Sequence, residues 1–67
     1  MSAADYGRRL GALTAERRLA ITAGLGSNAT FMADLDGEID AVRATYVGLA
    51  VTEIAQLRAA LDAPNRG

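Results

Sequence analysis

Apolar residues recur at helical spacing along the second half of the chain. They follow one another at steps of three or four residues, at Phe31, Leu35, Ile39, Val42, Tyr46, Ala50, Ile54, Leu57 and Leu61. Steps of this size keep side chains on one face of an α-helix. The pattern predicts a helix over about residues 30–62, which Pro64 limits at its far end. Gly37 and Gly48 lie inside this range, and a break at either glycine is compatible with the pattern.

The first half of the chain has a less regular helical pattern but clearer boundary signals. Ser2 and Asp5 have the spacing of a capping box, and apolar residues follow at Tyr6, Leu10 and Leu13. Gly24 favours termination, so a first helix is expected over about residues 3–23 and a loop over residues 24–29. The candidate caps of the second helix are Ser27, Asn28 and Thr30.

The segment DLDGEID, residues 34–40, allows a different interpretation. Asp36 and Gly37 have the chemistry of a two-residue hairpin turn, which would join strands on either side of them. Strict alternation fails, however, because adjacent apolar residues at Ala41 and Val42 would lie on opposite faces of a strand. The helix is therefore favoured, and an α+β fold with a short hairpin at residues 30–47 is the alternative.

The predicted fold is all-α: residues 1–67 form one small domain, a two-helix hairpin with a C-terminal tail at 63–67. Two helices alone cannot cover the long apolar face, because Val47, Leu49 and Val51 widen it. We therefore expect the fold to be completed by self-association or by docking on another protein. The predicted interaction face consists of Phe31, Leu35, Ile39, Val42, Tyr46, Leu49, Ile54, Leu57 and Leu61.

The amino-acid composition excludes most of the side chains that enzymes use for catalysis. The 67 residues include no cysteine, histidine or lysine, so thiol nucleophiles, imidazole bases and Schiff-base chemistry are all excluded. We expect a protein that is not an enzyme, with no cofactor and no small-molecule substrate.

The acidic segment also resembles part of a calcium-binding EF-hand loop. Gly37 and Ile39 occupy suitable positions, but Met32 and Arg43 stand where the first and last carboxylates of the loop belong. A thioether and a guanidinium cannot replace those two ligands. The sequence therefore predicts no metal site.

The charge pattern bears on nucleic acids and membranes. A net charge of −1 gives no general attraction to DNA, and no apolar run approaches the ~20 residues that span a bilayer. We expect a cytoplasmic protein, or a component of a virion assembled there, that does not bind a membrane. Local DNA contacts would come from Arg8, Arg9, Arg17, Arg18 and Asn28. Alternatively, the arginines are solvated or pair with the acidic stretch.

Residues 13–51 resemble the helix-turn-helix of the phage-repressor and Cro-like regulators. Ala20, Gly24 and Leu25 match the alanine, turn glycine and aliphatic residue of that motif, and TYVGLAV, residues 45–51, looks like the family's later helix. The resemblance implies a DNA-binding regulator with a reading helix over residues 27–35. That segment carries no arginine or lysine, and Asp34 would repel phosphate.

A second resemblance is to the small lambda W-type head-completion connectors of tailed phages. In this comparison LDGE is the turn of a hairpin and AVTEIAQLRAALD, residues 50–62, is the closing helix. The resemblance implies a small protein whose fold is completed in a larger assembly. We therefore expect a non-enzymatic assembly or interaction subunit, whose partner is a second copy of itself or a larger protein complex. The alternative is a small helix-turn-helix regulator.

Overall fold

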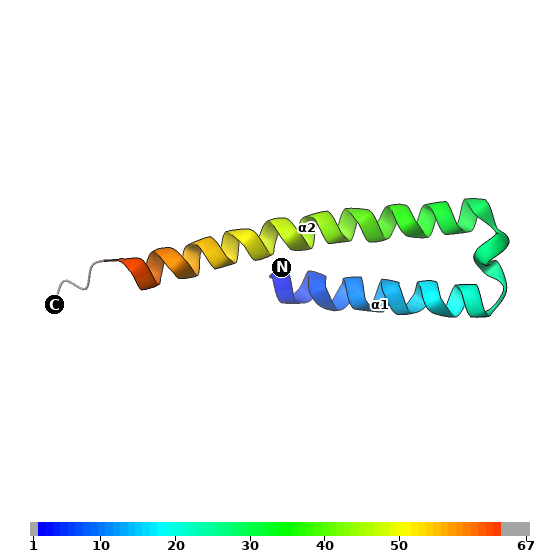
Figure 1. Ribbon diagram of the computed structural model, residues 1–67, viewed down its shortest axis with the longest axis horizontal. Helices are drawn as coiled ribbons and strands as arrows, with labels where there is room; N and C mark the ends of the chain where they lie inside the picture. Colours follow the sequence, from blue (N-terminus) through cyan, green and yellow to red (C-terminus); the bar gives the residue numbers. More distant parts are fainter. Residues whose placement is uncertain (1, 64–67) are drawn as a thin grey trace.

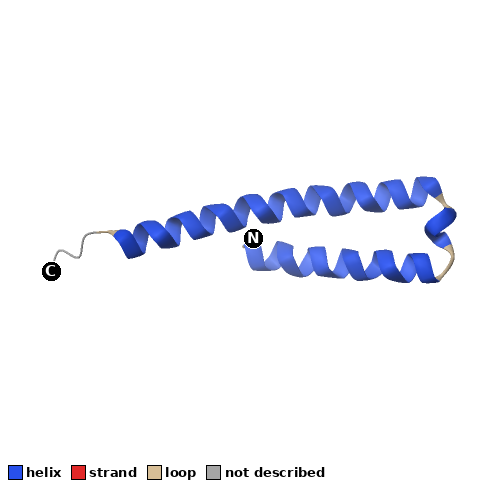
Figure 2. Ribbon diagram, viewed as in Figure 1, coloured by secondary structure: helices blue, strands red, loops and turns tan. Residues whose placement is uncertain are grey.

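Two antiparallel helices lying side by side form almost all of the computed structural model, which describes residues 2–63 (Figures 1 and 2). Helix α1 spans Ala3–Thr22, a single 3₁₀ turn, η1, spans Leu25–Ser27, and α2 spans Ala29–Asp62. The prediction of an all-α helical hairpin is confirmed. Between residues 2 and 63 there is no strand, so the alternative with a β-hairpin at residues 30–47 is wrong. Residues 64–67 of the expected tail lie outside the described range.

The start of α1 is fixed by the capping box that the sequence predicts. The Ser2 hydroxyl accepts a hydrogen bond from the Asp5 N–H at 3.4 Å, and the Asp5 carboxylate accepts one from the Ser2 N–H at 3.0 Å. These bonds satisfy amides that would otherwise have no partner at a helix start. Because the backbone and hydroxyl of Ser2 both donate to its carboxylate, and Arg8 lies beside it, the pKa of Asp5 is lowered.

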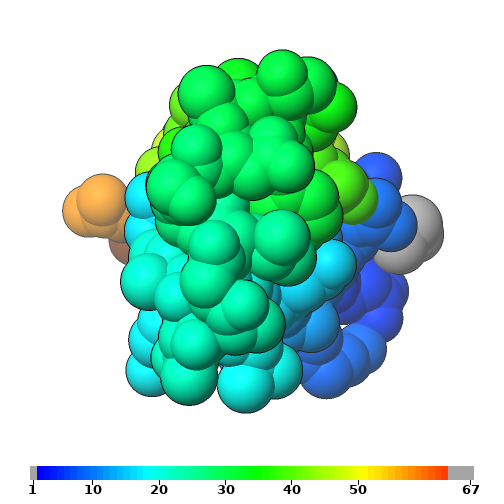
Figure 3. Space-filling model, turned by 90° about the vertical axis from the view of Figure 1, so that its right-hand side faces the viewer, coloured from blue at the N-terminus to red at the C-terminus, as the bar shows by residue number. Residues whose placement is uncertain are grey.

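The turn between the helices depends on a glycine and an asparagine. Gly24 has a φ of 90°, the left-handed conformation that glycine adopts without a steric penalty, and its N–H donates to the Ile21 carbonyl at 3.0 Å. Of the three candidate caps of α2, Asn28 takes the role, because its side-chain oxygen accepts from the Phe31 N–H at 3.0 Å. Viewed from this end, the two helices and the turn present one rounded surface (Figure 3).

Helix α2 runs through both of its glycines without a break. Each glycine costs roughly 1 kcal/mol relative to alanine in a helix interior. Burial of a leucine, isoleucine or valine stabilises by about 1.5–3 kcal/mol, and Leu35, Ile39 and Val42 are all buried on the face of α2 that packs on α1. The packing of these three side chains is therefore sufficient to keep the helix continuous past Gly37.

The core of the hairpin is small. It consists of Leu13 from α1 with Leu35, Ile39 and Val42 from α2, and the partly buried Tyr6, Leu10 and Phe31 pack against it. Two alanines, Ala3 and Ala20, are buried near the two ends of α1. Small residues at these positions let the backbones of the two helices approach closely. The core therefore extends along the whole of α1, but not along the whole of α2.

Glycines of α1 provide a matched test of how closely the helices pack. A Cβ added to Gly11 meets nothing within 4 Å, so Gly11→Ala is expected to raise the free energy of unfolding by about 0.5–1 kcal/mol. A Cβ added to Gly7 would lie 3.0 Å from Cε1 of Tyr46, so the ring must move, and Gly7→Ala is expected to gain clearly less. Urea unfolding followed by circular dichroism measures both, and equal gains would contradict the close contact of Gly7 and Tyr46.

The pKa shift of Asp5 predicts a pH dependence of stability. Because the folded-state pKa is lowered, the carboxylate stabilises the fold above the unfolded-state pKa, and this contribution is lost as pH falls through the folded-state pKa. Asp5→Asn is therefore expected to melt below the parent chain at neutral pH, and the two melting temperatures should converge below the ordinary aspartate range. Thermal melts at a series of pH values test this, and a difference that persists unchanged into acid would refute it.

Candidate interaction surface

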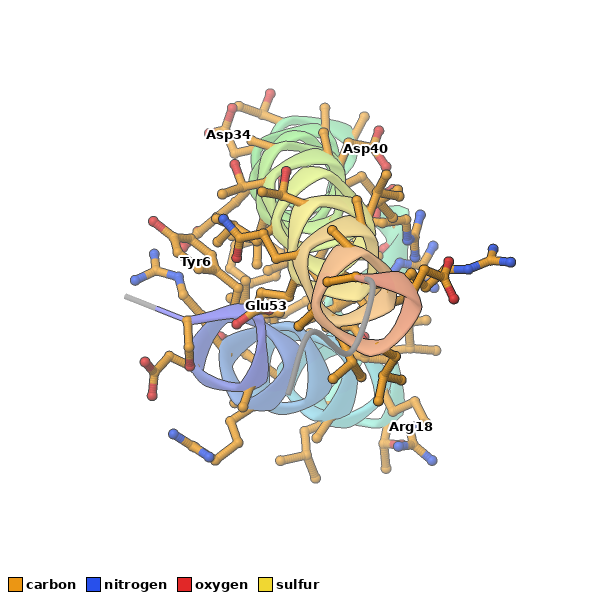
Figure 4. All side chains as sticks on the ribbon, turned by 90° about the vertical axis from the view of Figure 1, so that its left-hand side faces the viewer. Tyr6, Arg18, Asp34, Asp40 and Glu53 are labelled. Atoms are coloured by element: carbon orange, nitrogen blue, oxygen red, sulfur yellow. The ribbon has the colours of Figure 1, made fainter. Side chains whose placement is uncertain are left out.

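The N-terminal end of α1 lies beside α2 just past the middle of that helix, and α2 continues well beyond it (Figure 1). At 1.5 Å per residue, the 20 residues of α1 are about 30 Å long and the 34 residues of α2 about 51 Å. The Glu53 carboxylate accepts a hydrogen bond from the Ala3 N–H at 3.2 Å, over the first turn of α1 (Figure 4). Among the described residues, α2 has no neighbouring helix past this contact. We call residues 51–62, which begin about half a turn before the contact, the arm.

The arm exposes every one of its residues, including large apolar ones. Val51, Ile54, Leu57 and Leu61 leave 60%, 56%, 59% and 74% of their surface accessible, and Val47 one turn earlier leaves 51%. At about 100° of rotation per residue, these five lie within roughly a third of the helix circumference. We call Val47, Val51, Ile54, Leu57 and Leu61 the apolar stripe.

The stripe is large for a chain of this size. At roughly 100 Å² of exposed apolar surface for each side chain, the five present on the order of 500 Å². The largest contiguous apolar patch on a typical monomer is about 300–600 Å² and is often functional. The stripe is therefore the principal candidate surface of the described residues.

The predicted interaction face is divided by α1 into two parts. Leu35, Ile39 and Val42 are buried in the hairpin itself, where the covering surface is α1 of the same chain, and Phe31, Tyr46 and Leu49 are half-buried. Ile54, Leu57 and Leu61 remain exposed. Of the nine residues of the predicted interaction face, only Ile54, Leu57 and Leu61 belong to the apolar stripe.

Val47 and Val51 are the two stripe residues absent from the predicted face. The sequence shows them as apolar residues that widen the face, and each lies three or four residues from another stripe member. That spacing is the signal that places them with Ile54. They are left uncovered because α1 packs on a different side of α2.

The candidate DNA-contacting residues mostly serve the hairpin. Arg9 pairs with Glu38 at 3.0 Å and Arg17 with Asp36 at 2.7 Å, so each links α1 to α2. All four side chains are about half exposed, and such pairs contribute only about 0.2–1 kcal/mol each.

The other three candidates do not link the two helices. Arg8 pairs with Asp5 in the same helix, and Asn28 is occupied as the cap of α2. Arg18 points into solvent at the side of α1 (Figure 4). Arg8, in the first half of α1, and Asn28, at the turn, lie toward opposite ends of the hairpin.

In the helix the carboxylates of the acidic segment point in different directions, as Asp34 and Asp40 show on opposite sides of α2 (Figure 4). Within residues 2–63 no three acidic side chains converge as metal ligands would. Asp36 and Glu38 instead hold the arginines of α1.

A shallow, open depression lies between the helices and is lined by Tyr6, Arg9, Ala41, Val42 and Thr45. Two of its polar side chains are used within the chain, since Arg9 pairs with Glu38 and the Thr45 hydroxyl donates to the Ala41 carbonyl at 3.1 Å. The depression offers little that would orient a small molecule.

Neither of the two helices in the described part of the chain is long and apolar enough to cross a membrane. Comparison with protein-family models, with curated proteins and with solved structures yields no match.

Burial predicts a sharp contrast between core and stripe in the monomeric chain. Leu35→Ala removes a side chain that is 6% exposed and is expected to cost about 2–5 kcal/mol, enough to unfold so small a hairpin. Leu61→Ala, at a position 74% exposed, is expected to change the free energy of unfolding by less than about 0.5 kcal/mol. Urea unfolding at high dilution measures both, and similar losses at the two positions would contradict the assignment of core and stripe.

Proposed function

We propose that this chain is a non-enzymatic interaction subunit that acts by burying the apolar stripe against another protein surface, in a homo-oligomer or in a larger complex. One observation carries the proposal: α2 continues past the start of α1 as a helical arm whose apolar residues nothing in the hairpin covers.

Helix energetics support this function. A helical segment as short as the arm has little stability of its own in water, and helices in proteins are stabilised mainly by the packing of an apolar face. At about 25 cal/mol per Å², burial of roughly 500 Å² contributes on the order of 10 kcal/mol before the costs of association, which are about 4–15 kcal/mol. A partner surface on the stripe would therefore stabilise the arm and hold the subunit in place.

The alternative function, a helix-turn-helix regulator, has less support from the geometry. The two helices of that motif cross at about 90–120°, whereas α1 and α2 lie side by side and antiparallel (Figure 1). Arg9 and Arg17 are already paired with acidic residues of α2.

Sedimentation velocity with matched charge substitutions tests the proposed function. In extracts of the organism that encodes it, the chain is expected to sediment well above its 7.0 kDa mass. Leu57→Asp places a charge in the stripe and should return the chain to a monomer. Leu19→Asp places the same charge on α1, at a site 70% exposed, and should leave the assembly unchanged.

Two results would count against the interaction subunit. One is a chain that sediments as a monomer both when purified and in the extract, with Leu57→Asp changing nothing. The other is a purified monomer that binds duplex DNA with a steep dependence on salt, which would favour the regulator.

A further inference from the structure

The apolar stripe has a symmetry that suggests its partner. Val47 and Leu61 each lie seven residues from Ile54, and Val51 and Leu57 each lie three residues from it, on opposite sides. Reversing the direction of the helix about Ile54 therefore exchanges these four apolar residues in pairs, and it exchanges Ala50 with Arg58. A two-fold axis perpendicular to α2 performs that reversal, and a surface that matches itself under a two-fold axis is what a symmetric dimer requires.

We propose that the stripe is covered by the stripe of a second copy of this chain, packed antiparallel about a two-fold axis beside Ile54. This inference rests on the proposed function and names the occupant of the stripe. Val47 of each copy then lies opposite Leu61 of the other, Val51 lies opposite Leu57, and the two Ile54 side chains meet at the axis.

Charge on the same side of α2 favours the antiparallel direction. Continued toward the turn, at steps of three or four residues, the line of the stripe passes through Arg43, Asp40 and Asp36. In a parallel pair each of these would face its own copy, which sets like charges against one another. Antiparallel overlap limited to residues 47–61 moves the two sets of charges to opposite ends of the contact.

The ends of the contact are then complementary in charge. Arg43 lies one helical turn before Val47, and its side chain is 57% exposed. In the antiparallel pair it comes close to the last turn of α2 of the second copy, which carries Asp62. A cation beside the carboxyl end of a helix is stabilising, and Asp62 adds an attractive charge.

The hairpin leaves room for this neighbour. Core residues Leu35, Ile39 and Val42 face α1, and the middle of the stripe lies about a quarter of a turn further round the helix, at roughly 100° per residue. A second arm on the stripe therefore packs beside α1 and does not displace it. The core of each hairpin stays as it is in the single chain.

The contact area suits a dimer that forms and dissociates with concentration. Two stripes of roughly 500 Å² bury on the order of 1,000 Å² together, which is at the lower end for specific protein interfaces. Such an interface holds two copies at sufficient concentration and releases them on dilution.

Single-cysteine variants test both the partner and its direction, because the natural chain contains no cysteine. Ile54→Cys places its two sulfurs at the axis, where a disulfide can form between copies. Val47→Cys and Leu61→Cys should each link poorly alone, but should link when mixed. Under a mild oxidant, we expect Ile54→Cys alone and the Val47→Cys plus Leu61→Cys mixture to link at least about tenfold faster than Leu19→Cys, which lies outside the stripe.

A second mixture of variants controls for the possibility that the Ile54→Cys substitution itself changes the contact at the two-fold axis. If Ile54→Cys alters the contact, Val51→Cys mixed with Leu57→Cys should still link faster than either variant alone. Circular dichroism of each variant confirms that the hairpin is intact before the rates are compared.

The proposal is overturned by either of two patterns. Self-linking of Val47→Cys and of Leu61→Cys as fast as that of Ile54→Cys would show a parallel pair. Linking of every variant at the Leu19→Cys rate, with a purified chain that sediments as a monomer, would show that copies do not pair. If the chain in the extract is then still assembled and sensitive to Leu57→Asp, the proposed function stands and the occupant is a different protein.

Discussion

The difference in length between the two helices is the constraint on which the rest of the structure depends. An amphipathic helix must bury its apolar face, and α1, Ala3–Thr22, covers only the part of α2 that it reaches. The contact between Glu53 and the first amide of α1 marks where this cover stops. Before that contact Leu35, Ile39 and Val42 form a core, and after it the apolar residues of α2 are exposed. Val47 and Val51 lie before the contact but on a side of α2 that α1 does not cover.

Within the covered part, a few weak contacts set the alignment of the helices. The core supplies most of the stability, since Leu13, Leu35, Ile39 and Val42 are buried together. The Arg9–Glu38 and Arg17–Asp36 pairs add little energy because they are half exposed, but both cross between the helices and so favour the observed register. The acidic segment thus has a structural role in a chain whose net charge is close to zero.

Beyond Glu53 every residue of α2 is exposed to solvent. The exposure of Ile54, Leu57 and Leu61 to water is unfavourable, and no contact within the hairpin offsets it. A core of this size also leaves the folded chain only marginally stable. A partner on the stripe would extend the packed length of α2 and stabilise the whole hairpin. In the proposed antiparallel pair, folding and assembly are therefore coupled, because the same helix carries both the core and the interface.

The sequence by itself determined the helices and much of their boundaries. The spacing of apolar residues, the capping pair Ser2 and Asp5, and the glycine at position 24 are local signals, and local signals act through the backbone of neighbouring residues. It also showed one unbroken apolar series from Phe31 to Leu61, with Val47 and Val51 beside it. Such a series reports which side of a helix is apolar, but not what lies against that side.

Only the tertiary structure decided how that face is shared. The position of α1 along α2 depends on side-chain packing and cross-helix charge pairs between residues far apart in the chain, which no local pattern encodes. It separated Leu35, Ile39 and Val42, which are buried in the hairpin, from Ile54, Leu57 and Leu61, which are exposed. It also paired Arg9 and Arg17 with acids of α2, whereas the sequence left DNA, solvent and the acidic stretch as alternatives for them.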